Sequence, residues 1–166
     1  AGHARLANLV FFYDDNKITI AGGTALTFTE DVAKRFEAYG WWTTRIDGQC
    51  AADVARAIEA ARAQAAGGDG RPALILARTT IGRGSPGKAN SAVAHGAPLG
   101  ADETRRTKEA LGWPVEPTFL VPDDVRTAFG RIAEEKRAEA EAWRGKYAEW
   151  RRRHPALAEA LDAHLA

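Results

Sequence analysis

The stretch Pro72–Ala77 reads Pro-Ala-Leu-Ile-Leu-Ala, an apolar run without polar residues at alternate positions. Such a run is typical of a strand that is covered on both faces, as in a parallel sheet. Leu6–Tyr13 is a second compact apolar run of the same character, and Trp41–Ile46 also has strand length. Lys17–Ile20 is a short β-prone stretch. We therefore expect a sheet built around these three longer strands, two of which are apolar runs.

Helical patterns separate these strands. Thr29 is a suitable N-cap for a helix over Glu30–Tyr39, which Gly40 would end. The Ala-rich segment Asp53–Ala66 predicts another helix before the strand at Pro72–Ala77. The alternation of strand and helix predicts an α/β fold with a parallel sheet and right-handed crossovers.

Two segments lie where such sheets bind ligands, outside the carboxyl ends of the strands. Asp14–Gly23 follows the first strand, and Thr79–Gly100 follows the third. Loops longer than about 15 residues are uncommon unless they act as lids or binding loops. The length of Thr79–Gly100 is therefore itself an indication of function.

The last part of the chain has a different character. A short helix is expected over Glu103–Leu111, followed by a Pro-punctuated stretch, Trp113–Pro122. Asp123–Arg153 is charged and Ala-rich and predicts a long amphipathic helix, which Pro155 breaks. Its apolar spacing is too irregular for a heptad coiled coil. We expect one domain over residues 1–122 and a helical linker over 123–166.

Composition narrows the classes of partner. The chain has 166 residues, of which 27% are charged, and a formal net charge of +1. This balance gives no electrostatic reason to expect nucleic acid or a membrane as partner. Cys50 is the only cysteine, no apolar run is long enough to span a bilayer, and no export signal precedes the first strand. The expected compartment is the cytoplasm.

The amino end indicates a longer parent protein. The chain contains no methionine. Ala1–Leu6 has the pattern of a helix end that runs directly into a strand. We therefore expect the chain to begin inside a longer protein.

The segment Asp14–Ile18, with the sequence Asp-Asp-Asn-Lys-Ile, allows two interpretations. Its carboxylate and amide oxygens, with a backbone carbonyl nearby, could bind a hard cation such as Mg²⁺. The alternative is an Asx turn that ends a strand, and these residues alone favour the turn.

His95 also allows two interpretations, a ligand-binding residue or an exposed loop residue, and the pattern alone does not favour either. An imidazole beside glycine in a long loop can reach an anionic or hydroxylated ligand and exchange a proton near neutral pH. Many loop histidines are merely exposed. Gly82-Arg83-Gly84 lacks the lysine and serine of a nucleotide-binding loop and is a weak signal.

Taken together, these segments resemble the transketolase family. The matching blocks follow the order and approximate spacing of the family and are Tyr13–Ile20, Phe28–Trp41, Thr79–Pro86, His95–Gly100 and Leu111–Pro114. The resemblance runs from about Ala1 to Pro122. It reverses the balance for Asn16 and His95 in favour of ligand binding.

The resemblance implies a set of site residues. In the family this domain binds the diphosphate end of thiamine diphosphate through Mg²⁺ or Ca²⁺. Asn16 would then be a side-chain metal ligand near the diphosphate, and Ile18 would supply a backbone carbonyl to the metal. Ile81 would pack against the cofactor, and Asp14 would line the site. His95 would reach the diphosphate and the sugar substrate and assist proton transfer.

The resemblance also implies an activity and shows what is missing. The parent would be a homodimeric enzyme of the pentose phosphate pathway that moves a two-carbon ketol unit between sugar phosphates. The family's Gly-Asp-Gly metal motif would fall before Ala1, and its pyrimidine-binding domain after the linker. Gly68-Asp69-Gly70 is interpreted as a turn on the opposite side of the sheet. We therefore interpret the chain as a fragment that is inactive alone.

Two alternatives remain open. The parent could be another thiamine-diphosphate enzyme, such as a dihydroxyacetone synthase. A deoxyxylulose-phosphate synthase is disfavoured by the blocks Phe28–Trp41 and His95–Leu99. The other alternative is a non-catalytic module that uses the helix Asp123–Arg153 to bind a partner.

Overall fold

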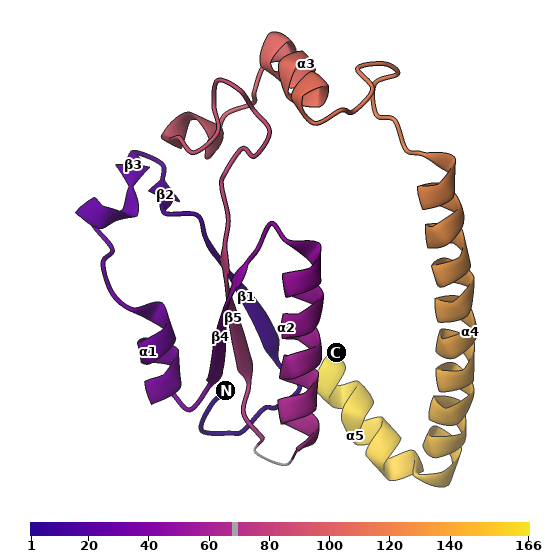
Figure 1. Ribbon diagram of the computed structural model, residues 1–166. Helices are drawn as coiled ribbons and strands as arrows, with labels where there is room; N and C mark the ends of the chain where they lie inside the picture. Colours follow the sequence, from indigo (N-terminus) through magenta and orange to yellow (C-terminus); the bar gives the residue numbers. More distant parts are fainter. Residues whose placement is uncertain (68–69) are drawn as a thin grey trace. The chain divides into compact units, whose positions relative to one another are not determined.

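The computed structural model describes residues 1–67 and 70–166 (Figure 1). It contains two compact units, Ala1–Val115 and Glu116–Ala166. The first unit has helices packed on a parallel sheet, so the predicted α/β class is confirmed. Gly68 and Asp69, two residues of the predicted Gly-Asp-Gly turn, lie outside the described residues.

The main sheet has three parallel strands in the order β1-β5-β4. They are β1 (Val10–Asp15), β4 (Trp42–Asp47) and β5 (Ala73–Arg78). In β5 every residue from Ala73 to Ala77 is buried. The central strand is hydrogen-bonded along both edges and covered on both faces, which explains its uninterrupted apolar sequence.

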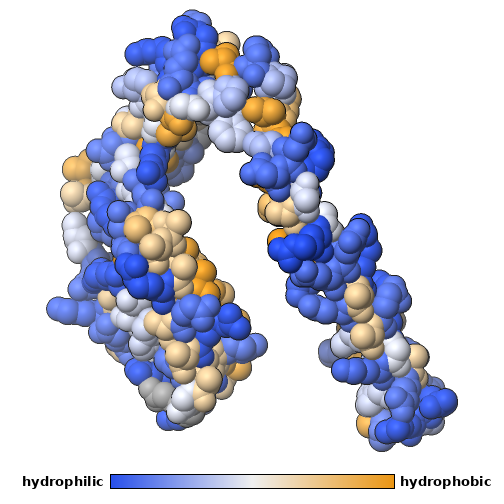
Figure 2. Space-filling view, turned by 45° about the vertical axis from the view of Figure 1, so that its right-hand side comes forward, coloured by the Kyte–Doolittle hydropathy of each residue, from blue (hydrophilic) through white to orange (hydrophobic). Residues whose placement is uncertain are grey.

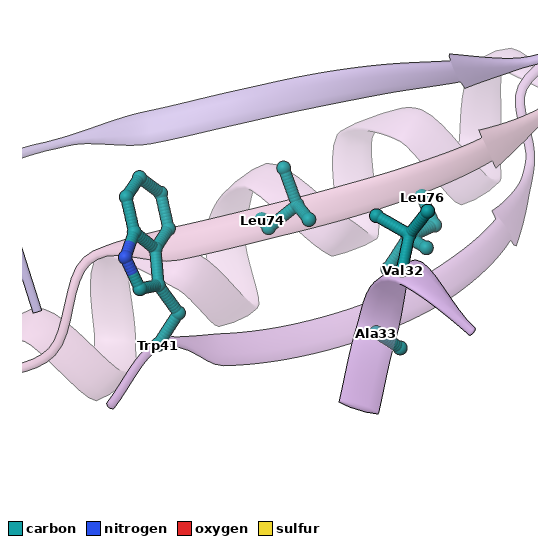
Figure 3. Packing of buried hydrophobic residues seen from close by; sticks show 5 residues of the cluster. All are labelled: Val32, Ala33, Trp41, Leu74 and Leu76. Carbon is teal, nitrogen blue, oxygen red and sulfur yellow. The ribbon is translucent and has the colours of Figure 1, made fainter. Parts of the chain in front are cut away.

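The two faces of the sheet carry separate core clusters. Leu74 and Leu76 point toward α1 (Val32–Ala38), where they join Val32, Ala33 and Trp41 (Figure 3). The intervening residues of β5 point the other way, because successive side chains of a strand alternate between faces. The second cluster lies under α2 (Ala51–Ala66) and consists of Ala57, Ala61, Ala73 and Ile75. The helices α1 and α2 therefore cover opposite faces (Figure 1).

The amino end differs from its predicted structure. Ala1–Arg5 forms turns instead of a helix end, and β1 begins at Val10 instead of Leu6. The helices α1 and α2 pack on β4 and β5 and leave the edge strand β1 less covered, so Phe11 and Phe12 are 50% and 47% exposed. The expectation that this strand is covered on both faces is wrong for the chain as described.

The start of α1 is also corrected. Asp31, not Thr29, is the N-cap, and its Oδ1 accepts a hydrogen bond of 3.3 Å from the amide of Lys34. The same carboxylate pairs with Arg45 on β4 at 2.6 Å. The Asp31 carboxylate thus pairs with both a free amide of the helix end and the guanidinium of Arg45. The neutral hydroxyl of Thr29 could not form such an ion pair.

Short elements complete the first unit. β2 (Ile18–Thr19) and β3 (Gly22–Gly23) form a small antiparallel pair, followed by the 3₁₀ turn η1 (Thr24–Leu26). The long loop contains a second 3₁₀ turn, η2 (Ala92–Ala94), and leads into α3 (Ala101–Ala110).

The second unit is helical. α4 (Asp123–Arg153) has the predicted bounds, and Pro155, which was expected to break it, opens a further helix, α5 (Pro155–Leu165), within the segment expected to be helical. Proline is well suited to the first turn of a helix, so it ends one helix by starting another. Arg151 joins the two helices through two hydrogen bonds to Asp162, at 2.8 and 2.6 Å.

The surface of α4 is mostly hydrophilic, with scattered hydrophobic side chains (Figure 2). Along it Trp143, Tyr147 and Trp150 stack in sequence, with ring centroids 5.0 and 5.7 Å apart. Among the described residues, no helix combines the length and apolar character needed to cross a membrane.

Candidate functional site

The three strands of the main sheet end at one edge. Asp15 of β1 and Asp47 of β4 both stand opposite Arg78, the last residue of β5. The segments that begin at Asn16, Gly48 and Thr79 therefore leave the sheet side by side. This is the edge at which parallel α/β sheets bind ligands.

Asp14 is held by the neighbouring strand. It is exposed, and its Oδ1 accepts a hydrogen bond from the hydroxyl of Thr79. The guanidinium of Arg78 donates to the backbone carbonyl of Asp15 at 2.6 Å. Two side-chain bonds thus fix the end of β1, one to the last residue of β5 and one to the first residue of the long loop.

Asn16 forms the Asx turn that the sequence allowed. Its Oδ1 accepts a hydrogen bond of 2.9 Å from the amide of Ile18. Lys17, between them, has a left-handed φ of 64°, and its carbonyl accepts the amide of Thr24 at 3.0 Å. The turn holds the half-buried amide of Asn16 in place after the strand.

The turn offers two oxygen atoms that could be ligands of a hard cation, fewer than such an ion needs. An amide oxygen has two lone pairs, so the turn leaves one of those on Asn16 for another partner. The Asn16 amide and the Ile18 carbonyl are oxygen donors of the kind that Mg²⁺ and Ca²⁺ prefer. Within residues 1–67 and 70–166, no three or more His, Cys, Asp or Glu side chains gather as a metal cluster. Asn16 and Ile18 therefore fit a cation whose other ligands come from outside this set, such as phosphate or water.

Ile81 is half-buried near the start of the long loop and is fixed through its backbone. Its carbonyl accepts the amide of Asn90 at 2.9 Å. The carbonyl of Thr80, just before it, accepts the side-chain amide of Gln49 at 3.2 Å. Arg83 in turn donates to the carbonyl of Gln49 at 3.0 Å.

The loop after β4, with Gly48 and Gln49, was missed by the sequence reasoning. A Cβ on Gly48 would lie 2.8 Å from the side chains of Ala77 and Thr79, so glycine permits the close approach of β4 to the end of β5. The signal that could have found Gln49 is its position directly after a predicted parallel strand, at the same edge as the other two loops.

His95 lies farther along the long loop, directly after η2, and is exposed. Its backbone amide donates to the carbonyl of Ala92 at 3.0 Å. The structure thus brings Asp14 to the start of the loop at Thr79, whereas His95 lies in an exposed turn farther along the loop. An exposed imidazole is available both to solvent and to an incoming ligand.

A hollow of about 240 Å³ lies beside the same edge, but it is not the predicted site. None of the five predicted site residues lines it. Its charged groups are already paired, Lys17 with Asp15 and Arg45 with Asp31, both at 2.6 Å.

The first unit is therefore a parallel α/β domain, with three loops at the edge of the sheet where such domains bind ligands. Over residues 1–166 it matches the family model described as transketolase, thiamine diphosphate binding domain. The chain belongs to the transketolase family.

Individual relatives agree with this assignment. The chain is 40% identical over 163 residues to a transketolase of Halalkalibacterium halodurans, covering 98% of this chain and 24% of the relative. It is 45% identical over 156 residues to a chloroplastic transketolase of Zea mays, covering 93% and 22%. The chain spans about a quarter of the length of these curated relatives.

Solved structures give the same result. A transketolase of Pichia stipitis in complex with sedoheptulose-7-phosphate superposes with a TM-score of 0.81 and 35% identity, over 95% of this chain and 23% of that one. The transketolase of Leishmania mexicana gives a TM-score of 0.82 and 33% identity, over 94% and 23%. The resemblance seen in the sequence blocks is confirmed.

Proposed function

We propose that this chain is the diphosphate-binding part of a transketolase. The complete protein would transfer a two-carbon ketol unit from a ketose phosphate to an aldose phosphate. The observation that carries the proposal is the family match over residues 1–166, on a fold whose segments Asp14–Ile18 and Thr79–Ile81 leave the sheet at one edge. Two structures of transketolase from Pichia stipitis, one of them a mutant, are complexes with sugar phosphates, fructose-6-phosphate and sedoheptulose-7-phosphate.

The cofactor in this proposal is thiamine diphosphate with Mg²⁺ or Ca²⁺. Bound there, the cofactor supplies the electron sink for carbon–carbon cleavage. Asn16 and Ile18 would hold the divalent ion through their amide and carbonyl oxygens, and the Asx turn would keep the Asn16 oxygen oriented. Ile81, fixed through its own carbonyl, would exclude water beside the cofactor.

His95 and Asp14 would act on the polar groups at the site. The exposed imidazole of His95 can donate to a diphosphate oxygen and accept or return a proton of a sugar hydroxyl at a ring nitrogen. Asp14, held by Thr79, would line the site and keep its acceptor oxygens oriented.

The assembly and its setting belong to the same proposal. The complete protein would be a cytoplasmic homodimer of the pentose phosphate pathway. The remaining metal ligand and the pyrimidine-binding residues would come from parts of the enzyme outside these 166 residues. Cys50 is the only cysteine, so these 166 residues can form no internal disulfide, which is compatible with a reducing compartment.

The test uses the complete product of the gene, purified and supplied with thiamine diphosphate and Mg²⁺. Fructose 6-phosphate serves as donor and an aldose phosphate as acceptor, with formaldehyde as acceptor in a parallel reaction. Transfer to the aldose phosphate supports the proposal. Transfer to formaldehyde alone would assign a dihydroxyacetone synthase, and binding of no cofactor would leave the non-catalytic module.

A further inference from the structure

Glu103 is a buried carboxylate on a helix that is otherwise largely exposed. It is the one buried residue of α3, 8% exposed, and it lies in the first turn of that helix. Burying a carboxylate is unfavourable unless hydrogen bonds replace its water. The hydrogen-bond partners of the carboxylate therefore indicate its structural role.

Those partners come mainly from the long loop. The hydroxyl of Ser85 and the amide of Gly87 both donate to Oε1 of Glu103, the latter at 2.7 Å. Arg106, one turn along α3, lies 3.1 Å from Oε2. The Ser85 hydroxyl first, and then the Gly87 amide, lower the pKa of Glu103, so the charged form is the one the loop stabilises.

The network continues from Ser85 to Lys88. The amide of Lys88 donates to the Ser85 hydroxyl oxygen at 3.0 Å, so that hydroxyl both accepts and donates. The ammonium of Lys88 donates to the carbonyl of Leu99 at 2.8 Å. Lys88 thereby closes residues 88–99 into a loop anchored at both ends, and His95 lies within it.

The steric pattern supports the same anchor. A Cβ on Gly87 would lie 3.2 Å from a carboxylate oxygen of Glu103, so glycine leaves room for the carboxylate. Gly84 has a left-handed φ of 88°, and a Cβ there would lie 2.7 Å from Leu111, just after α3. The base of the loop is thus held at two points by α3 and the residue that follows it.

From these contacts we infer that Glu103 and Lys88 are positioning residues for His95. Glu103 fixes the start of the closed loop through Ser85 and Gly87, and Lys88 fixes its end at Leu99. The inference rests on the proposed function, in which His95 contacts the diphosphate and the sugar.

The test uses the complete protein with Glu103→Gln, which removes the charge and keeps the shape, and Lys88→Met, which removes the ammonium. The matched control is Glu109→Gln, the same change on the same helix, at a carboxylate whose side chain is 51% exposed and paired with Arg105. Hydrogen exchange of the amides of residues 88–99 is measured without cofactor. Steady-state kinetics give kcat and KM for the donor sugar.

We expect exchange in residues 88–99 to become about tenfold faster in both variants. Lys88→Met loses the hydrogen bond from the ammonium to Leu99, and Glu103→Gln leaves the Ser85 and Gly87 donors with an uncharged, weaker acceptor. The urea midpoint should stay close to that of the unchanged protein in Lys88→Met and should fall in Glu103→Gln, which lacks the stabilising charge of the buried carboxylate. In both variants kcat/KM for the donor should fall about tenfold. Glu109→Gln should leave both the exchange of residues 88–99 and kcat/KM for the donor unchanged. Unchanged exchange in both variants would show that Glu103 and Lys88 do not anchor residues 88–99 and would overturn the inference.

The remaining outcomes are also decisive. Faster exchange with unchanged kcat/KM would show an anchor that does not position His95, and would overturn the inference. An inactive parent enzyme would defeat the proposed function, while the exchange measurement would still decide whether the anchor exists. If Glu103→Gln does not fold, Ser85→Ala replaces it, because Gly87 and Arg106 still serve the carboxylate.

Discussion

The hydroxyl of Thr79 donates a hydrogen bond to Oδ1 of Asp14 across neighbouring strands. In the sheet register Asp14 stands opposite Ala77, so Thr79 reaches back from just beyond the end of β5. The bond joins the two segments that hold the predicted site residues, although they are far apart in the chain.

Replacing Thr79 by Val should loosen this junction. The change keeps the shape and removes the donor, so we expect a loss of about 0.5–1 kcal/mol in the free energy of unfolding and a several-fold weaker affinity for thiamine diphosphate. Urea unfolding and a cofactor titration measure the two effects. Thr79→Ser keeps the hydroxyl and should restore most of the affinity, and equal affinities of the two variants would contradict the role of the bond.

Asn16 should be sensitive to loss of its oxygen. Asn16→Ala removes both the acceptor for the Ile18 amide and the proposed metal ligand. We expect at least about tenfold weaker Mg²⁺-dependent cofactor binding, because even groups that only orient metal ligands contribute that much. Isothermal calorimetry with and without EDTA measures it. Asn16→Asp keeps an oxygen in place and is expected to bind more tightly than Asn16→Ala, and the reverse order would count against the ligand role.

Cys50 leaves a helix end without a side-chain cap. It is the N-cap of α2, with extended φ and ψ, but its thiol makes no capping hydrogen bond. Serine or aspartate there can accept from the exposed amides of the first turn. Cys50→Ser should raise the free energy of unfolding by about 0.5–1 kcal/mol, read from urea denaturation. Cys50→Ala supplies no acceptor and should not show this gain.

Gly84 and Gly96 should respond oppositely to alanine. Gly84 has a φ of 88° and faces Leu111, whereas a Cβ on Gly96 would meet nothing within 4 Å, and Gly96 has no left-handed φ. Gly84→Ala should therefore lower the free energy of unfolding by about 1 kcal/mol or more. Gly96→Ala should be neutral or raise it slightly. Thermal unfolding of both variants checks the contrast, and equal shifts would contradict it.

The buried carboxylate of Glu103 should make the free energy of unfolding decrease at low pH. Ser85 and Gly87 hold its pKa in the folded protein below its ordinary value, so the unfolded chain binds the proton first as pH falls. Its contribution is fully present above the ordinary glutamate pKa of about 4.3. It is lost as pH falls from there through the lowered pKa of the folded state.

Urea unfolding between neutral and strongly acidic pH tests this linkage. The unchanged protein should lose stability on acidification more steeply than Glu103→Gln, whose side chain does not titrate. Parallel curves for the two proteins would show that Glu103 contributes nothing to the acid dependence. Asp31, whose pKa is lowered by the Lys34 amide and by Arg45, remains in both proteins and cancels in the comparison.

Local patterns in the sequence were sufficient for the class of fold and the family. The apolar run Pro72–Ala77 predicted a strand covered on both faces, because such a strand needs apolar residues at every position, and the burial of Ala73–Ala77 in β5 agrees with it. The bounds of α4 followed from its charged, Ala-rich composition after the Pro-punctuated stretch and from Pro155, which breaks the pattern. The ordered blocks from Tyr13 to Pro114 identified the family. The roles of Asn16 and His95 remain predictions.

Tertiary structure decided the contacts between distant residues. It placed β5 between β1 and β4, which left Phe11 at an open edge. It selected Asp31 over Thr29 as the cap of α1, because Arg45 on β4 pairs with that carboxylate. It also brought Glu103 to the base of the loop that holds His95. None of these partners is near in sequence, and packing of the sheet and its helices determines which polar groups meet.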